Sequence, residues 1–232
     1  MILSFSASGF DVLLALDGSL PERQFFLENS RLPIIAADGA ALSLAKIGVS
    51  AQEAIGDFDS LTAENRDDLQ LAGTKLIYDA GQDDNDFEKL LRYALNNGQR
   101  RFLLCGFQGG ELEHTLNNWS VLMKYAANPN TDACFCIYDS GRYAVPVNQS
   151  LEVNLHTGEI VSLIPQPLAR VTTRGLEWRL DNEELRLGRR EGARNRAISP
   201  NVGIELHQGS YLLCLDSRLP LAPAFETKNN SK

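Results

Sequence analysis

Carboxylate side chains gather in short turns of the first half of the sequence. "GDFDS" places Asp57 and Asp59 directly after the apolar run "EAI", and "GQDDNDFEKLL" places Asp83 and Asp86 after "KLIYD". Carboxylate oxygens suit Mg²⁺, which is usually held in phosphoryl transfer by one or two carboxylates together with phosphate oxygens. These turns are therefore candidates for a site that binds a divalent cation and phosphate.

Two further turns stand in the same position relative to apolar runs. "AADGA" carries Asp38 and Gly39 after "PIIA", and "GFQGGELEH" carries Gly109, Gly110 and His114 after "RFLLC". Glycine lets the backbone approach a phosphate closely. A single such Asp is most often a plain turn residue, and His114 alone could make a structural hydrogen bond at a helix start. Four such turns in succession favour one shared site.

Electrostatics supports a cation at this site. Two carboxylates ~6 Å apart repel by about 3 kcal/mol at an effective dielectric constant of ~20. Gathering Asp38, Asp57, Asp59, Asp83 and Asp86 on one rim multiplies this repulsion, and a hard divalent cation removes it. The sequence contains neither G-x-x-x-x-G-K-[ST] nor G-x-G-x-x-G, so we expect neither a P-loop nor a dinucleotide-binding protein.

The elements that would position these turns follow from hydrophobic periodicity. Buried strands are predicted at "DVLLAL", "RLPIIAA", "TKLIYD", "RRFLLCGF" and "ACFCIYD". Helices are predicted over 86–97 and over 115–126, the second with Leu116, Trp119 and Met123 on its inner face. This alternation predicts an α/β domain with a mainly parallel, Rossmann-like sheet, in which ligands bind beyond the carboxyl ends of the strands.

The pattern changes near Asp139. Beyond it the segments are short and strand-like: "YAVPV", "LEVNL", "EIVSLI", "ARVTT", "LEWRL", "ELRLG", "VGIEL" and "YLLCLD". Such a series predicts an all-β sandwich or flattened barrel. We therefore expect two domains, 1–142 and 143–232.

Bulk composition excludes some classes of function. The chain has 232 residues and a formal net charge of −8, which argues against a nucleic-acid groove. No apolar run reaches the ~18 residues that span a bilayer, and "MILSFSASGFD" lacks the features of a secretory signal, so we expect a cytoplasmic protein. The four cysteines are interpreted as reduced core residues: Cys105, Cys134, Cys136 and Cys214.

Taken together, the motifs resemble those of the thiamine pyrophosphokinase family. "LALDGSLP", "AADGAA", "IGDFDSL", "QDDNDFEKLL", "GFQGGELEHTLNN", "GEIVSLIP", "GLEWRL" and "GARN" occur in the family's order over nearly the whole chain. The resemblance implies a β-sandwich domain after the α/β domain, and a homodimer with its active sites at the subunit interface. It also implies Mg²⁺ as cofactor and ATP as pyrophosphoryl donor, with attack of the thiamine hydroxyl on the β-phosphorus and release of AMP.

The resemblance also implies residue roles. Asp57, Asp59, Asp83 and Asp86 would hold the metal and, with His114, serve catalysis; Asp83 and Asp86 match the family's D-x-T-D, with Asn85 in place of Thr. The residues expected to bind the nucleotide are Asp38, Gly39, Ser60, Gly109, Gly110 and Asn118. Those expected to bind thiamine are Trp178, Arg194 and Asn195, although Trp178 could instead be a core aromatic residue of the sandwich.

Three positions depart from the family pattern. Glu111 replaces an Arg, Glu113 replaces an Asp, and Arg194 replaces a Ser. An anion in place of a cation beside a triphosphate reverses a favourable interaction. We hypothesise that Arg194, from either subunit, supplies the cation that position 111 lacks. Two alternatives remain open: pyrophosphoryl transfer to another hydroxymethyl heterocycle such as a pterin, and a non-catalytic protein that binds a nucleotide or vitamin.

Overall fold

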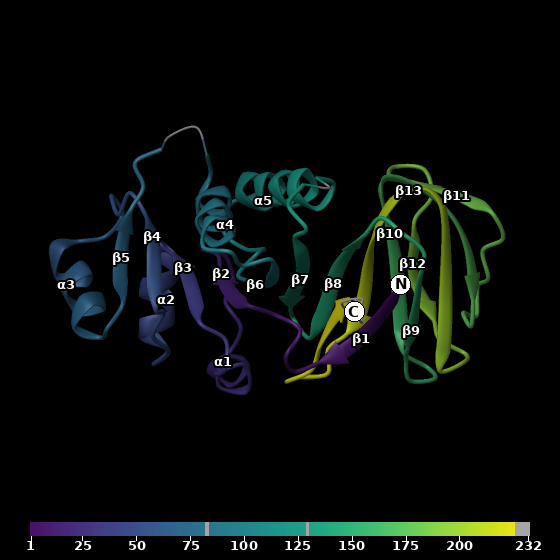
Figure 1. Ribbon diagram of the computed structural model, residues 1–232, viewed down its shortest axis with the longest axis horizontal. Helices are drawn as coiled ribbons and strands as arrows, with labels where there is room; N and C mark the ends of the chain where they lie inside the picture. The colour runs from purple at the N-terminus through teal and green to yellow at the C-terminus, as the bar shows by residue number, and fades with distance from the viewer. Residues whose placement is uncertain (82–83, 129, 226–232) are drawn as a thin grey trace, which may run out of the picture. The chain divides into compact units, whose positions relative to one another are not determined.

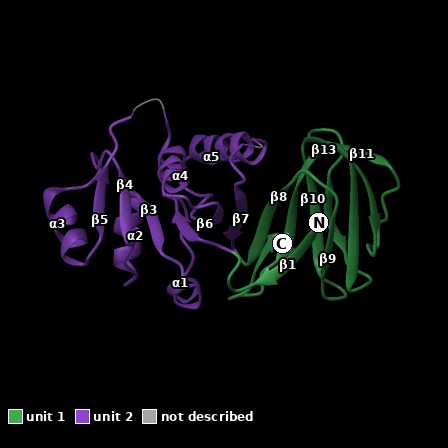
Figure 2. Cartoon of the chain, viewed as in Figure 1, with its two compact units in different colours: residues 1–9, 141–232 green, residues 10–140 purple. Residues whose placement is uncertain are grey.

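The computed structural model describes residues 1–81, 84–128 and 130–225 (Figure 1). The chain divides into two compact units, one of residues 10–140 and one of residues 1–9 with 141–232 (Figure 2). The expected boundary near residue 143 is close to the observed one. The expected placement of residues 1–9 in the first domain is wrong, because their strand pairs within the second unit.

Parallel strands form the sheet of unit 10–140, in the order β7-β6-β2-β3-β4-β5 (Figure 1). The chain starts at the centre with β2, proceeds outward to β5, and returns to β6 on the other side of β2. The strands are β2 (Val12–Ala15), β3 (Ile34–Ala37), β4 (Glu53–Gly56), β5 (Lys75–Tyr78), β6 (Arg101–Cys105) and β7 (Cys134–Asp139). The central strands are buried along their length, which explains their continuous apolar sequences.

Helices connect these strands: α1 (Arg23–Glu28), α2 (Asp38–Lys46), α3 (Ala63–Leu71), α4 (Asp86–Asn96) and α5 (Leu112–Ala126). Helix α4 confirms the predicted 86–97 helix to within one residue. Asn85 caps it by accepting the Glu88 N–H at 2.8 Å. Its buried stripe is Phe87, Leu90, Leu91 and Ala94, and Lys89 is buried with them.

Helix α5 begins three residues earlier than the predicted 115–126 helix. The predicted inner face is also partly wrong. Leu116 is exposed, Trp119 and Met123 are half-buried, and the buried residues are Val121 and Leu122. The N-terminal turns of α5 therefore extend beyond the apolar core, which leaves their polar residues free to line a site.

Mainly antiparallel strands form the other unit: β1 (Ile2–Ser6), β8 (Arg142–Val147), β9 (Leu151–Asn154), β10 (Ile160–Arg174), β11 (Glu183–Arg186), β12 (Gly192–Arg196), β13 (Asn201–Asp216) and β14 (Ala222–Phe225). The runs "EIVSLI" and "ARVTT" belong to the single strand β10, and "VGIEL" and "YLLCLD" belong to β13. The β10–β13 register shifts between Pro165 and Ala169, and this irregularity lets the long strands bend without ending. "LEWRL" contributes only the isolated bridge of Leu176 to Ala197, and is not a strand.

The first strand of the chain completes this unit. β1 pairs antiparallel with β14 and parallel with β9. Leu3 is almost fully buried, which accounts for the apolar start of the sequence. The N-terminal segment is therefore a structural part of the β unit.

Two expectations about the chain as a whole can be compared with the described residues. None of their helices has the length and apolar character needed to cross a membrane. All four cysteines are free thiols, as expected, but only Cys105 and Cys136 are buried, so the expected core placement is wrong for the half-buried Cys134 and Cys214. Burial raises the pKa of the Cys136 thiol well above its usual value.

Candidate active site

The acidic turns of unit 10–140 lie at one edge of its sheet. Because the strands are parallel, the turns that follow β6, β2, β3, β4 and β5 emerge at their shared carboxyl edge, in that spatial order. The β2 turn carries Asp17, the β3 turn Asp38 and the β4 turn Asp57. The direction of the chain reverses between β2 and β6, and ligands of open α/β sheets bind at such a point.

Asp17 and Asp38 are electrostatically coupled. Partial desolvation raises the pKa of Asp17, although its side chain reaches solvent. The Asp38 and Asp86 carboxylates raise this pKa further, and His114 lowers it. Burial likewise raises the pKa of Asp38, the Gly39 N–H lowers it, and the Asp86 carboxylate adds to the increase. The protein thus gathers negative charge from three separate turns and places His114 next to it.

Asp17 was not among the predicted site residues, although the sequence contains a signal for it. Asp17–Gly18 follows a buried strand just as Asp38–Gly39 does. A Cβ atom added to Gly39 would lie 2.4 Å from Asp17 Oδ2, so the Asp17 carboxylate lies against the start of α2. The missing side chain at position 39 makes room for that carboxylate.

The β4 turn holds Asp57 and Asp59 through its own backbone. Asp57 is half-buried and its Oδ1 accepts the Asp59 N–H at 3.2 Å, whereas Asp59 and Ser60 are exposed. Phe58 between the two carboxylates is buried and has a φ of 56°, in the left-handed region. The turn therefore places the phenyl ring inside and leaves both acidic side chains access to solvent.

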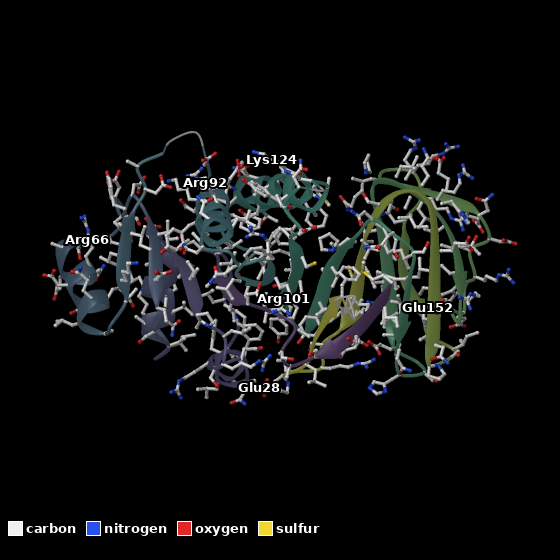
Figure 3. All side chains as sticks on the ribbon, viewed as in Figure 1. Glu28, Arg66, Arg92, Arg101, Lys124 and Glu152 are labelled. Carbon is white, nitrogen blue, oxygen red and sulfur yellow. The ribbon has the colours of Figure 1, made fainter. Side chains whose placement is uncertain are left out.

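The segment before α4 is held by Arg92, which projects from that helix (Figure 3). Its guanidinium pairs with Asp84 and, at 2.8 Å, with Asp79. The Gly81 N–H and Arg92 lower the pKa of Asp79. Asp83, a predicted metal ligand, lies outside the described residues. Asp86 is exposed at the first position of α4, and the buried Lys89 ammonium lies 3.7 Å from its Oδ1.

Glycines join the turns after β2 and β6. The Gly18 N–H donates to Gly106 O at 3.0 Å, and the Ser19 N–H donates to Gln108 O at 2.6 Å. A Cβ atom on Gly106 would lie 2.1 Å from Leu16 O, and one on Gly109 would lie 2.4 Å from Ser19 Oγ. Both glycines also have positive φ, so only glycine suits this close approach.

Asn118 connects three of the structural elements around the edge. Its Nδ2 donates to Phe107 O at 3.2 Å, and its Oδ1 accepts from Asn85 Nδ2 at 3.3 Å. The amide therefore ties α5 to the β6 turn and to the N-cap of α4. Asn85, at the position where the resemblance has Thr, keeps the capping role and adds this side-chain contact.

The start of α5 carries His114 and Glu111. Both side chains are exposed, and His114 Nε2 lies 4.0 Å from Glu111 Oε2. Glu111 stands at the N-cap but makes no capping hydrogen bond with its side chain. Both groups can therefore turn toward a ligand at the edge.

The predicted metal ligands are not preassembled. Among residues 1–81, 84–128 and 130–225, no three Asp, Glu, His or Cys side chains lie close enough to hold a metal ion together. The donor set nevertheless fits Mg²⁺, since it consists of carboxylate oxygens and since Asp17, Asp38 and Asp86 repel one another. Asp57 also contributes to this repulsion at Asp38.

Three residues of the β unit were expected to bind an acceptor substrate. Trp178 is 56% exposed, so the alternative of a core aromatic residue is wrong. Asn195 is buried; its Oδ1 accepts the Trp178 N–H at 3.1 Å and its Nδ2 donates to Trp178 O at 2.7 Å. Arg194 is exposed, has a φ of 57° and donates its N–H to Ser162 Oγ at 2.9 Å, where the β10–β12 register is irregular.

The fold and the edge define a class of protein: an α/β unit with an acidic site at a topological switch point, joined to a β unit with an exposed tryptophan. Comparison with known proteins narrows this class. Residues 26–135 match the family described as "Thiamin pyrophosphokinase, catalytic domain", and residues 145–211 match "Thiamin pyrophosphokinase, vitamin B1 binding domain". The chain belongs to the thiamine pyrophosphokinase family.

Individual relatives agree with this assignment. Thiamine pyrophosphokinase 2 of Arabidopsis thaliana is 33% identical over 145 residues, which cover 57% of this chain and 53% of that protein. Thiamine pyrophosphokinase of Bacillus subtilis is 33% identical over 91 residues, 39% of this chain and 42% of that protein. The chain therefore spans about half the length of the curated relatives that it matches.

Solved structures match over more of the chain. Thiamin pyrophosphokinase from Geobacillus thermodenitrificans has a TM-score of 0.73 at 25% identity, covering 94% of this chain and 98% of that one. The Bacillus subtilis structure has a TM-score of 0.75 at 21% identity, covering 90% and 100%. At 21% identity, the similarity to the Bacillus subtilis structure shows a shared fold and nothing more.

Proposed function

We propose that the protein is an ATP-dependent diphosphotransferase that transfers the pyrophosphoryl group of ATP to the hydroxyl of thiamine. The products are thiamine diphosphate and AMP. The observation that carries this proposal is the mutual repulsion of Asp17, Asp38 and Asp86 at the switch point, in a chain whose two parts match both family domains. Such a group of carboxylates suits a cation that also binds phosphates.

The acidic turns after β4 and before α4 would bind the cation that the reaction needs. Asp57, Asp59, Asp83 and Asp86 would hold Mg²⁺. Bound Mg²⁺ would neutralise charge on the ATP phosphates. Pyrophosphoryl transfer needs alignment and charge stabilisation more than covalent help from the protein. The hydrogen-bonded, closely packed glycine turns after β2 and β6 support this positioning role.

The phosphates of ATP would be bound by main-chain and polar groups around the metal. We assign this role to Ser60, Gly39 and the Gly109–Gly110 backbone. Exposed His114, which lies near Asp17, would orient a phosphate oxygen. Asn118 would act indirectly, because its amide already binds the protein on both sides.

The β unit would supply the acceptor site. Trp178 offers an exposed aromatic face for a flat heterocycle. Asn195 keeps the Trp178 backbone in place, and Arg194 adds a positive charge. We also propose that the α/β unit has a Rossmann-like fold, that the β unit is a β-sandwich, and that the protein is cytoplasmic.

We further propose a homodimer with each active site at the subunit interface. Acidic residues outnumber basic ones in residues 10–140, and the reverse holds for the remaining residues. Opposite charge favours contact between the α/β unit of one copy and the β unit of another. Mixing Asp57→Ala chains with Trp178→Ala chains tests this arrangement at a thiamine concentration well below the raised KM of Trp178→Ala, where each variant alone is nearly inactive, because a heterodimer would contain one intact site. A mixture that exchanges subunits but stays inactive would refute the shared site.

The reaction is tested by incubating the protein with ATP, Mg²⁺ and thiamine and measuring AMP. AMP that forms only with thiamine supports the proposal. If AMP forms only with another hydroxymethyl heterocycle, such as a hydroxymethyl pterin, then that heterocycle, and not thiamine, is the acceptor. Tight ATP binding without AMP for any acceptor would identify a binding protein and overturn the proposal.

A further inference from the structure

Asp38 occupies an unusual place for a carboxylate. It directly follows β3, is the first residue of α2, and is 8% exposed. A Cβ atom added to Gly56, the last residue of β4, would lie 2.6 Å from Asp38 Oδ2. The carboxylate therefore fits against the neighbouring strand at the point where the Asp57–Asp59 turn begins.

Both oxygens of Asp38 accept hydrogen bonds from the backbone. Oδ1 accepts the Gly39 N–H at 2.7 Å, and Oδ2 accepts the Phe58 N–H at 3.1 Å. The first bond is local to α2. The second reaches across to the turn after the next strand, twenty positions further along the chain. Asp38 thus holds a backbone group between the two carboxylates of that turn, Asp57 and Asp59.

Phe58 needs such support. Its φ of 56° lies in the left-handed region, which bulky L-residues rarely adopt, and its side chain is 4% exposed. This conformation directs the ring inward and leaves Asp57 and Asp59 on the solvent side. A relaxed backbone at Phe58 would turn at least one of these acidic side chains away from the edge.

We propose that Asp38 is a positioning residue, which acts through the Phe58 N–H to keep Asp57 and Asp59 in their ligand-binding orientation. This inference rests on the proposed function for the role of those two carboxylates. It differs from the expectation that Asp38 itself serves the metal and phosphates. The side chain is buried, and its oxygens already bind the backbone of two turns.

A double-mutant cycle separates positioning from direct binding. Asp38→Asn keeps the size of the side chain and replaces one acceptor by a donor. Phe58→Gly removes the conformational penalty at position 58, because glycine adopts positive φ freely. Phe58→Leu is the matched control, since it also removes the ring but keeps a side chain that disfavours positive φ.

The first measurement is binding of Mn²⁺, a paramagnetic substitute for Mg²⁺, by electron paramagnetic resonance in the presence of ATP. Asp38→Asn should weaken binding by about tenfold in the natural and Phe58→Leu backgrounds. The loss should fall below about twofold in the Phe58→Gly background. An equal loss in all three backgrounds would show that Asp38 binds the metal directly, and would overturn the proposal.

The second measurement requires neither metal nor turnover. Asp38→Asn should accelerate amide hydrogen exchange at Phe58 by about tenfold or more, while the amides of β6 keep their protection. Unchanged exchange at Phe58 would overturn the proposal even if Phe58→Gly fails to fold. Absence of AMP formation would contradict the proposed function but leave this result intact, so the two failures are distinguishable.

Turnover provides a third readout. A positioning role predicts that Asp38→Asn raises the Mg²⁺ concentration needed for half-maximal rate and leaves kcat within about threefold at saturating Mg²⁺. A fall of kcat by about 100-fold at saturation would indicate that Asp38 contacts the reacting groups, which contradicts the positioning role.

Discussion

The side chain of Asn195 binds the backbone of Trp178 on both sides, accepting its N–H at 3.1 Å and donating to its carbonyl oxygen at 2.7 Å. Asn195 is 5% exposed, whereas Trp178 is 56% exposed. A buried amide thus fixes the position of an exposed ring. The residue that matches the family's thiamine-contact stretch is consequently engaged with the protein itself.

Replacement of Asn195 should affect stability and acceptor binding together. We expect Asn195→Ala to reduce the free energy of unfolding by about 1–3 kcal/mol, because it leaves buried backbone groups without partners. Trp178→Ala should leave stability nearly unchanged and raise the KM for thiamine by about tenfold or more. Urea unfolding and steady-state kinetics check both. A destabilised Asn195→Ala protein with an unchanged KM for thiamine would contradict the link to Trp178.

Asp57 and Asp86 should be required for turnover but not for folding. Asp57→Ala and Asp86→Ala should each lower kcat by about 100-fold or more, because each removes a ligand for the cation that neutralises the phosphates. Circular dichroism should show folded proteins, since Asp86 is exposed and Asp57 is half-buried. Asp67→Ala, at an exposed position of α3, is the matched control and should retain full activity. Wild-type rates in either site variant would refute the ligand assignment.

Stability should depend on pH through Asp17. Its pKa is raised in the folded state above the ordinary value of 3.8, so the ionised form destabilises the fold. This penalty is absent below pH 3.8, grows as the pH rises through the folded-state pKa, and is complete once the pH lies well above that pKa.

Asp17→Asn should therefore raise the Tm at pH 7 in the absence of Mg²⁺, by an amount equivalent to less than about 1 kcal/mol because the group reaches solvent. The gain should vanish near about pH 3 and shrink when Mg²⁺ is added. Thermal melts across pH check this, with Asp67→Asn as control. A gain that persists at low pH would exclude charge as its cause.

Glu111 and Arg194 should be functionally coupled if the arginine compensates for the missing cation. Glu111→Arg should lower the KM for ATP by about tenfold, because a guanidinium binds phosphate oxygens well. Ser120→Arg, at an exposed position of the same helix, should have little effect.

The coupling itself is measured by Arg194→Ser in both backgrounds. It should raise the KM for ATP in the natural protein and have a much smaller effect when Glu111→Arg is present. Independent effects of the two substitutions would rule out the compensation hypothesis.

Hydrophobic periodicity was sufficient to predict most of the α/β unit. Helix α4 occurs as expected because its apolar stripe and the Asn85 cap act locally. In the β unit, by contrast, the sequence suggested breaks within β10 and β13 that the structure lacks. At these bulges and bends, the backbone N–H and C=O groups pair with residues distant in sequence, and local sequence patterns do not encode such pairing.

The sequence was sufficient to predict which turns carry the site, but not which side chains in those turns contact one another. The acidic turns after β3 and β4 were identified because parallel strands bring their ends together. Asp17 was missed although its turn has the same Asp-Gly pair after a strand as the turn of Asp38, and its coupling to Asp38 and Asp86 depends on strand order. The left-handed backbone of Phe58 and Arg194 had no sequence signal, since neither is glycine or asparagine.

The pairing of β1 with β9 and β14 has a consequence for biosynthesis. Residues 10–140 are continuous and can fold on the ribosome as soon as β7 has emerged. β1 is synthesised before these residues, yet its pairing partners β9 and β14 are synthesised after them. β1 can therefore reach its final place only after residues 10–140 have been made.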